Sequence, residues 1–97
     1  MNDVIAKLHS LEGIEEQIPH KIRMSISHFG HKGQGIFHGE WVELMKGDSK
    51  SILSIINNWN ESTSFKLQDE DGVVHVFNQE FLKSCVLSVQ LVKKEEE

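Results

Sequence analysis

The sequence predicts a small α+β domain with mostly antiparallel strands, either a five-stranded sheet or a small bent barrel, and two helices. Three observations predict this class. Apolar residues recur at three- and four-residue steps in two segments, alternate with polar residues in several others, and are separated by short turns rich in glycine or aspartate. Short turns favour antiparallel pairing, because parallel strands need long crossover connections.

Residues 2–18 form the first predicted element, a helix. Its apolar residues fall on one stripe: Val4, Ile5, Leu8, Leu11, Ile14 and Ile18. Gly13 weakens the helix by about 1 kcal/mol relative to alanine and offers an earlier end. Pro19 ends it in any case, because the residue before a proline is pushed out of the helical region. We expect this N-terminal helix to pack on the sheet or across a dimer.

Residues 21–29 and 36–46 are predicted to form a hairpin around a glycine-rich connection at 30–35. The first strand alternates apolar and polar residues, as a half-buried strand does. The second strand carries apolar residues at both parities, and Gly39 marks a candidate bulge. An apolar strand of this kind predicts that both of its faces are covered, one of them by a helix or a partner.

The second half of the chain predicts a central helix after the first hairpin, a second hairpin, a short helical turn and a last strand. Asp48 or Ser49 is expected to cap the central helix, and Asn78 the short turn. The Asp-Gly pair that precedes Val73 suits a tight hairpin. The corresponding ranges are 49–59 for the helix, 63–68 and 73–77 for the hairpin strands, and 85–92 for the last strand.

The chain predicts one domain over residues 1–92 and a disordered charged tail over 93–97. Its 97 residues contain one cysteine, which cannot form an internal disulfide. No apolar stretch approaches the ~20 residues of a membrane span, and the N-terminus lacks the order of a secretory signal. We therefore expect a cytoplasmic protein without membrane contacts. The excess of lysine over arginine and the absence of tyrosine point to a low-GC bacterium or its phage.

Histidines are the candidate metal ligands. His28, His31 and His38 could supply imidazoles to a transition metal, but their spacing matches no recognised zinc pattern. We therefore predict no metal and no cofactor. The alternative is a metal-dependent or acid–base enzyme that uses these histidines with Glu40.

Aromatic residues of the first hairpin are the candidate partner-binding group. Phe29, Phe37 and Trp41 exceed what one small core needs, and the glycine-rich loop adds His31 and Lys32. Exposed aromatic groups on a sheet are frequent in protein interfaces. The same hairpin could bind nucleic acid through its cations and Phe29, but the net charge of -5 makes nucleic acid the less favoured partner.

The sequence therefore predicts a non-enzymatic protein-binding or regulatory module that acts through an apolar sheet or helix face. Its partner would be another protein or a second copy of the chain. The composition suggests a narrower version, an inhibitor of a host factor. A histidine-based metal enzyme and a nucleic-acid-binding protein remain the alternatives.

Overall fold

The computed structural model describes residues 2–28 and 35–94. Its elements follow the predicted order of helix, hairpin, helix, hairpin, short turn and strand, and they confirm the α+β class. Two antiparallel sheets form instead of one, and neither closes into a barrel within the described residues. The elements are α1 (Asn2–Leu11), β1 (His20–His28), β2 (Ile36–His38), β3 (Val42–Glu43), α2 (Asp48–Asn57), the 3₁₀ turn η1 (Trp59–Glu61), β4 (Ser64–Gln68), β5 (Val74–Asn78), α3 (Gln79–Leu82) and β6 (Cys85–Lys93).

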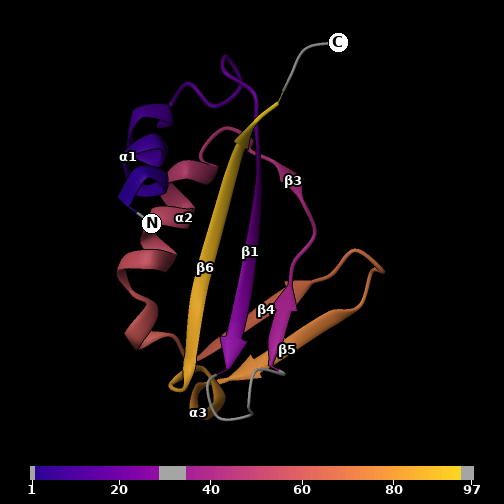
Figure 1. The fold of residues 1–97 in the computed structure, drawn as a ribbon. Coiled ribbons are helices and arrows are strands. Elements are labelled where there is room, and N and C mark those ends of the chain that lie inside the picture. The colour runs from indigo at the N-terminus through magenta and orange to yellow at the C-terminus, as the bar shows by residue number, and fades with distance from the viewer. Residues whose placement is uncertain (1, 29–34, 95–97) are drawn as a thin grey trace.

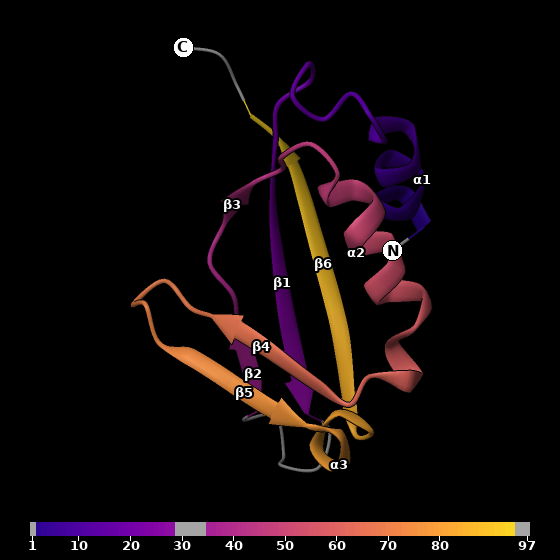
Figure 2. The ribbon, with the colours of Figure 1, turned by 180° about the vertical axis from the view of Figure 1, so that it is seen from behind.

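The larger sheet is built around β1, with β6 on one side and β2 and β3 on the other. β1 and β6 run side by side along the length of the molecule (Figure 1). The smaller sheet is the β4–β5 hairpin, which crosses one face of the larger sheet (Figure 2). Beyond the last strand, the Lys94 N–H donates to the Pro19 carbonyl, and residues 95–97 of the predicted tail lie outside the described residues.

The predicted strand 36–46 is broken by a bulge at Gly39. His38 lies opposite Ser25 and Val42 opposite Ile22, so the bulged strand uses one residue more than β1 between these pairs. A Cβ on Gly39 would lie 2.7 Å from both the Leu67 Cδ1 and the Met24 carbonyl oxygen. The break therefore divides the strand into β2 and β3, and it reverses which parity faces inward.

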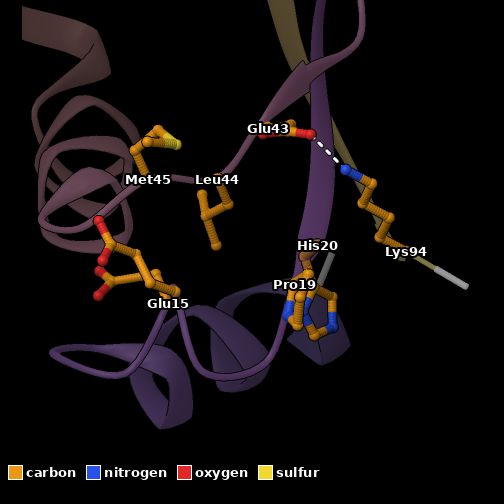
Figure 3. Close-up of a pocket in the computed structure, with 8 residues that line it drawn as sticks. Glu15, Pro19, His20, Glu43, Leu44, Met45 and Lys94 are labelled. Carbon is orange, nitrogen blue, oxygen red and sulfur yellow. Dashed lines mark hydrogen bonds and ion pairs between the residues drawn. The ribbon is translucent and has the colours of Figure 1, made fainter. Parts of the chain in front are cut away.

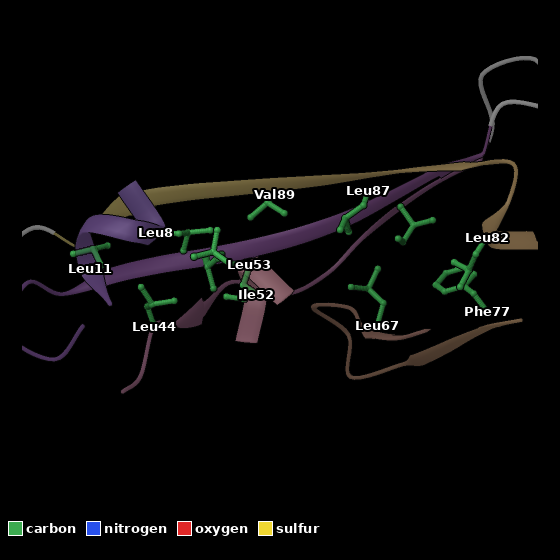
Figure 4. Close-up of a cluster of buried hydrophobic side chains, with 12 residues drawn as sticks. Leu8, Leu11, Leu44, Ile52, Leu53, Leu67, Phe77, Leu82, Leu87 and Val89 are labelled. Atoms are coloured by element: carbon green, nitrogen blue, oxygen red, sulfur yellow. The ribbon is translucent and has the colours of Figure 1, made fainter. Parts of the chain in front are cut away.

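One hydrophobic core lies on a single side of β1 and β6 (Figure 4). Helices α1 and α2 cover one end of this inner face, and the β4–β5 hairpin and α3 cover the other. Leu8 of α1 and Ile26 of β1 are fully buried. Because the apolar stripe of α1 belongs to this core, the first helix is packed within its own domain.

Helix α1 ends at Leu11, well before the predicted end at residue 18. Gly13 adopts a φ of 82°, a left-handed conformation that favours glycine and stops the helix. Turns then lead to Pro19. Of the two helix ends that the sequence allowed, the earlier one, at Gly13, is therefore correct. Among the described residues, no helix is long and apolar enough to cross a membrane.

The β4–β5 hairpin and α3 form as their local sequence predicts. The Asp69 carboxylate accepts the N–H groups of Asp71 and Val73, and Gly72 takes the left-handed conformation that the turn needs. Asn78 accepts the Phe81 N–H at 2.9 Å and caps α3. Short-range turn and cap chemistry is sufficient to specify this part of the fold.

Candidate protein interface

The predicted partner-binding residues do not form one surface. Phe29, His31 and Lys32 lie outside the described residues. Phe37 pairs with Ile26 on the inner face of the larger sheet. Trp41 lies on the opposite face, where the Arg23 guanidinium carbon is 4.9 Å from its ring centroid. The bulge at Gly39 separates the two, since residues of equal parity would otherwise share a face.

Phe37 belongs to an aromatic cluster between the larger sheet and the hairpin. Its ring centroid lies 5.2 Å from that of Phe77, in an edge-to-face arrangement, and 5.4 Å from that of His75. Phe81 of α3 stacks on Phe77 at 5.5 Å and on His28 at 4.4 Å. Packing of this kind fixes the rings and gives the cluster a definite shape.

A groove of about 500 Å³ opens beside this cluster and along β5. Its lining consists of aromatic and apolar side chains, one imidazole and one amide, and it contains no lysine or arginine. The lining residues are Phe37, Val74, His75, Val76, Phe77, Asn78 and Phe81. The groove is therefore an apolar depression with few polar groups, as is usual where proteins bind other molecules.

The edge of β5 that borders this groove has no strand beside it among the described residues. The Asp69 N–H donates to the Val73 carbonyl, which sets the phase of the β4–β5 hydrogen bonds. Since bonded pairs alternate along an antiparallel ladder, His75 and Phe77 bond toward β4. The N–H and C=O groups of Val74 and Val76, and the N–H of Asn78, therefore point toward the outer edge.

His75 and Asp69 form the polar end of the groove. The His75 Nε2 lies 2.9 Å from the Asp69 Oδ2. This hydrogen bond, followed by those from the backbone N–H groups of Val73 and Asp71, lowers the pKa of Asp69 below its usual value. Asp69 is therefore a carboxylate at neutral pH, and it holds the imidazole in place.

The outer face of the larger sheet is the second candidate surface, because no described helix or strand covers it (Figure 1). Its centre is polar: Arg23 donates two hydrogen bonds to Gln90, and the Ser25 hydroxyl bonds His38. Exposed apolar groups are scattered around this centre, with Ile36 at 55% exposure and Val92 at 47%. A mixed surface of this kind is typical of the solvated face of an antiparallel sheet.

The candidate metal ligands do not converge. His38 pairs with Ser25 on the outer face, whereas His28 stacks on Phe81 on the inner side. His31 lies outside the described residues. Within residues 2–28 and 35–94, no group of three or more His, Cys, Asp or Glu side chains could hold a metal ion. Burial raises the pKa of the Cys85 thiol, which donates to the Phe81 carbonyl rather than to an activating base.

A smaller pocket of about 250 Å³ lies where the loop after α1 meets β3 and the start of α2 (Figure 3). Glu43 and Lys94 form an ion pair at its rim, and the hydrogen bond from Lys94 lowers the pKa of Glu43. Glu15 is only 1% exposed, and its carboxylate accepts the N–H groups of Gly47 and Ser49. Gly47, not the expected Asp48 or Ser49, is the N-cap of α2, and no side chain local to the helix caps it.

Sequence reasoning missed the β5 groove: of the residues that line it, only Phe37 was predicted to bind a partner. The available signal was the segment Val73–Phe77, in which three valines accompany Phe77. These valines remain about half exposed or more, and Val76 reaches 65%. Comparison of the chain with protein-family models, curated protein sequences and solved structures finds no match.

Proposed function

We propose that the protein is a non-enzymatic protein-binding module whose binding surface is the β5 groove. The single observation that carries this proposal is the coincidence of two features. The apolar groove lies beside the edge of β5 with which no described strand pairs, and the same strand forms both features. The groove provides apolar surface, and the edge provides hydrogen-bonding groups that a partner can satisfy.

The chemistry of the groove favours binding over catalysis and favours protein over nucleic acid. Its only titratable lining group is His75, which is held by Asp69 and has no nucleophile beside it among the lining residues. Phosphate backbones require cations, and none lines the groove. The net charge of -5 acts in the same direction.

The composition supports a narrower setting for this module. We propose that the protein comes from a low-GC bacterium or from a phage of such a bacterium. It would act in the bacterial cytoplasm as an inhibitor of a host factor. Only the lysine-rich and tyrosine-free composition supports this setting. Self-association of the chain remains the alternative way to cover its exposed apolar groups.

Site-specific photocrosslinking tests the proposed function. The photoreactive residue benzoylphenylalanine replaces Val76 in one protein and Val92, on the outer face, in a matched control. In an extract of the native host we expect a discrete adduct from the first protein and not from the second. Excess unlabelled chain should displace this adduct, whereas an unlabelled chain that carries Val74→Lys and Val76→Lys should not. Equal adducts at both positions, or none at residue 76, would contradict the proposal.

A further inference from the structure

We infer that the β5 groove takes an extended segment of a partner protein, which adds to the β4–β5 hairpin as a third strand. The segment carries apolar side chains at alternate positions and a basic residue beside the turn at 69–71. This inference rests on the proposed function and names the kind of partner.

The backbone of β5 has hydrogen-bonding groups that face outward and can pair with such a segment. Val74 and Val76 direct their N–H and C=O groups away from β4, and Asn78 directs its N–H the same way, as the phase of the hairpin requires. An added strand would bond these three residues in turn, which is how extended peptides bind exposed sheet edges. The opposite edge of the hairpin is not equivalent, because the Gln68 carbonyl of β4 already accepts the Glu40 N–H.

The side chains define an alternating pattern in the partner. Partner residues opposite His75 and Phe77 would point inward, over the floor that Phe37 and Phe81 provide. Partner residues opposite Val74 and Val76 would lie on the outer face of the hairpin. These two valines are 53% and 65% exposed and provide apolar cross-strand neighbours there. The inward positions of the partner are therefore expected to be apolar.

The charges at the end of the groove select a basic segment. Asp69, Glu70 and Asp71 crowd the turn that begins where β4 ends, and the groove lining itself contains no cation. At the opposite end of β5, the charge of Glu80 is offset by Lys83, which lies 3.5 Å away. A lysine or arginine beside the turn would therefore be attracted, and an acidic residue repelled.

A second copy of the chain fits this edge less well than an extended segment does. β5 has only five residues, whereas a stable interface buries roughly 800 Å² on each partner. If the β5 strand of a second copy paired with this edge, its inward-facing Phe77 could not enter the groove, because Phe77 is 6% exposed and is packed in the core of its own chain. A separate extended segment has no such core and can place two side chains in the groove.

Calorimetry with a synthetic probe tests the inference on the full, untagged chain. The probe is the blocked peptide Lys-Thr-Leu-Val-Leu-Thr-Lys, which reads the same in both directions and so brings a lysine to the turn in either orientation. We expect saturable binding of one peptide per chain. A peptide with glutamate in place of both lysines should bind about tenfold more weakly at low salt.

Two backbone variants test the strand pairing. Val76→Pro removes an edge-facing N–H that makes no bond to β4, so binding should fall at least about tenfold; Val76→Thr keeps the N–H and should stay within about twofold. On the peptide side, N-methylation of the central valine should abolish binding of an antiparallel peptide, in which that N–H faces β5, and N-methylation of the following leucine should abolish binding of a parallel one. In either orientation, one methylation should abolish binding and the other should not. The peptide pair keeps the test valid even if Val76→Pro fails to fold.

Each remaining outcome contradicts the inference. Peptide binding that is unaffected by Val76→Pro and by both methylations would mean that no strand pairing occurs. A chain that light scattering shows to be a dimer, and that Val76→Pro converts to a monomer, would assign the edge to a second copy. If the peptide does not bind but residue 76 still crosslinks to a host protein, the extended-segment inference fails and the proposed function stands. If the peptide does not bind and residue 76 forms no crosslink, both the extended-segment inference and the proposed function are wrong.

Discussion

The Glu15 carboxylate accepts the backbone N–H of Ser49 at 3.3 Å, across 34 residues of sequence. The same oxygen accepts the Gly47 N–H at 3.2 Å. Glu15 therefore caps α2 from the loop that follows α1, where its negative charge meets the positive end of the helix dipole. Glu15 (Figure 3) thereby joins the loop after α1 to the start of α2, at the end of the molecule away from the β4–β5 hairpin (Figure 2).

Replacement of Glu15 by glutamine should lower the melting temperature and weaken the pH dependence of stability. The hydrogen bond from its own backbone N–H, together with those from Ser49 and Gly47, holds the pKa of Glu15 below its ordinary 4.5, although burial opposes this shift. A depressed pKa means that the carboxylate stabilises the folded state above about pH 4.5 and that this contribution is lost as the pH falls further.

Thermal unfolding of both proteins at about pH 7 and about pH 3.5 measures this effect. Glu43 and Asp69 have lowered pKa values in both proteins, so the difference between the two pH profiles isolates Glu15. Identical profiles for the native chain and Glu15→Gln would show that the carboxylate does not hold the helix.

Gly39→Ala should destabilise the fold by about 1–3 kcal/mol, as overpacking of a close contact does. The added methyl group would meet the Met24 carbonyl oxygen, which belongs to the backbone of β1 and cannot rotate away. Denaturant unfolding measures the change, and Glu40→Ala, at the next residue, is the control and should stay within about 0.5 kcal/mol. Equal stability of Gly39→Ala and the native chain would mean that the bulge is looser than described.

Amide hydrogen exchange along β6 should alternate in a monomer. The Lys94 N–H donates to Pro19, and the register then directs the N–H groups of Ser88 and Gln90 toward β1. Those of Leu87, Val89 and Leu91 point to the other edge, where no strand pairs with β6 among the described residues. We expect slow exchange for the first pair and faster exchange for the other three residues. Uniformly slow exchange would indicate that a second copy of the chain covers this edge.

Elements specified by nearby residues were the ones that sequence could predict. The Asp-Gly turn, the Asn78 cap and the apolar stripe of α2 depend on groups within a few positions, and all three form. The cap of α2 was predicted incorrectly because its acceptor, Glu15, lies far away along the chain. No local pattern could show this contact.

The candidate interface could not be predicted for the same reason, because it depends on residues that are far apart in the chain. Phe37 and Trp41 have equal parity, so a continuous strand would place them on one surface. The extra residue at the bulge turns them to opposite faces, and Gly39 was recognised as a candidate bulge without this consequence. The β5 groove arises only when Phe37, β5 and α3 are brought together, which depends on the packing of the hairpin against the larger sheet.

The most direct measurement of the binding surface is amide exchange and chemical shift in the ¹⁵N-labelled chain, with and without the lysine-ended peptide. The amides of Val74, Val76 and Asn78 should become protected on binding, while those of His75 and Phe77, which bond β4, should be protected in both samples. Shifts that centre instead on Trp41 and the outer face, with the three β5 amides unchanged, would contradict the account.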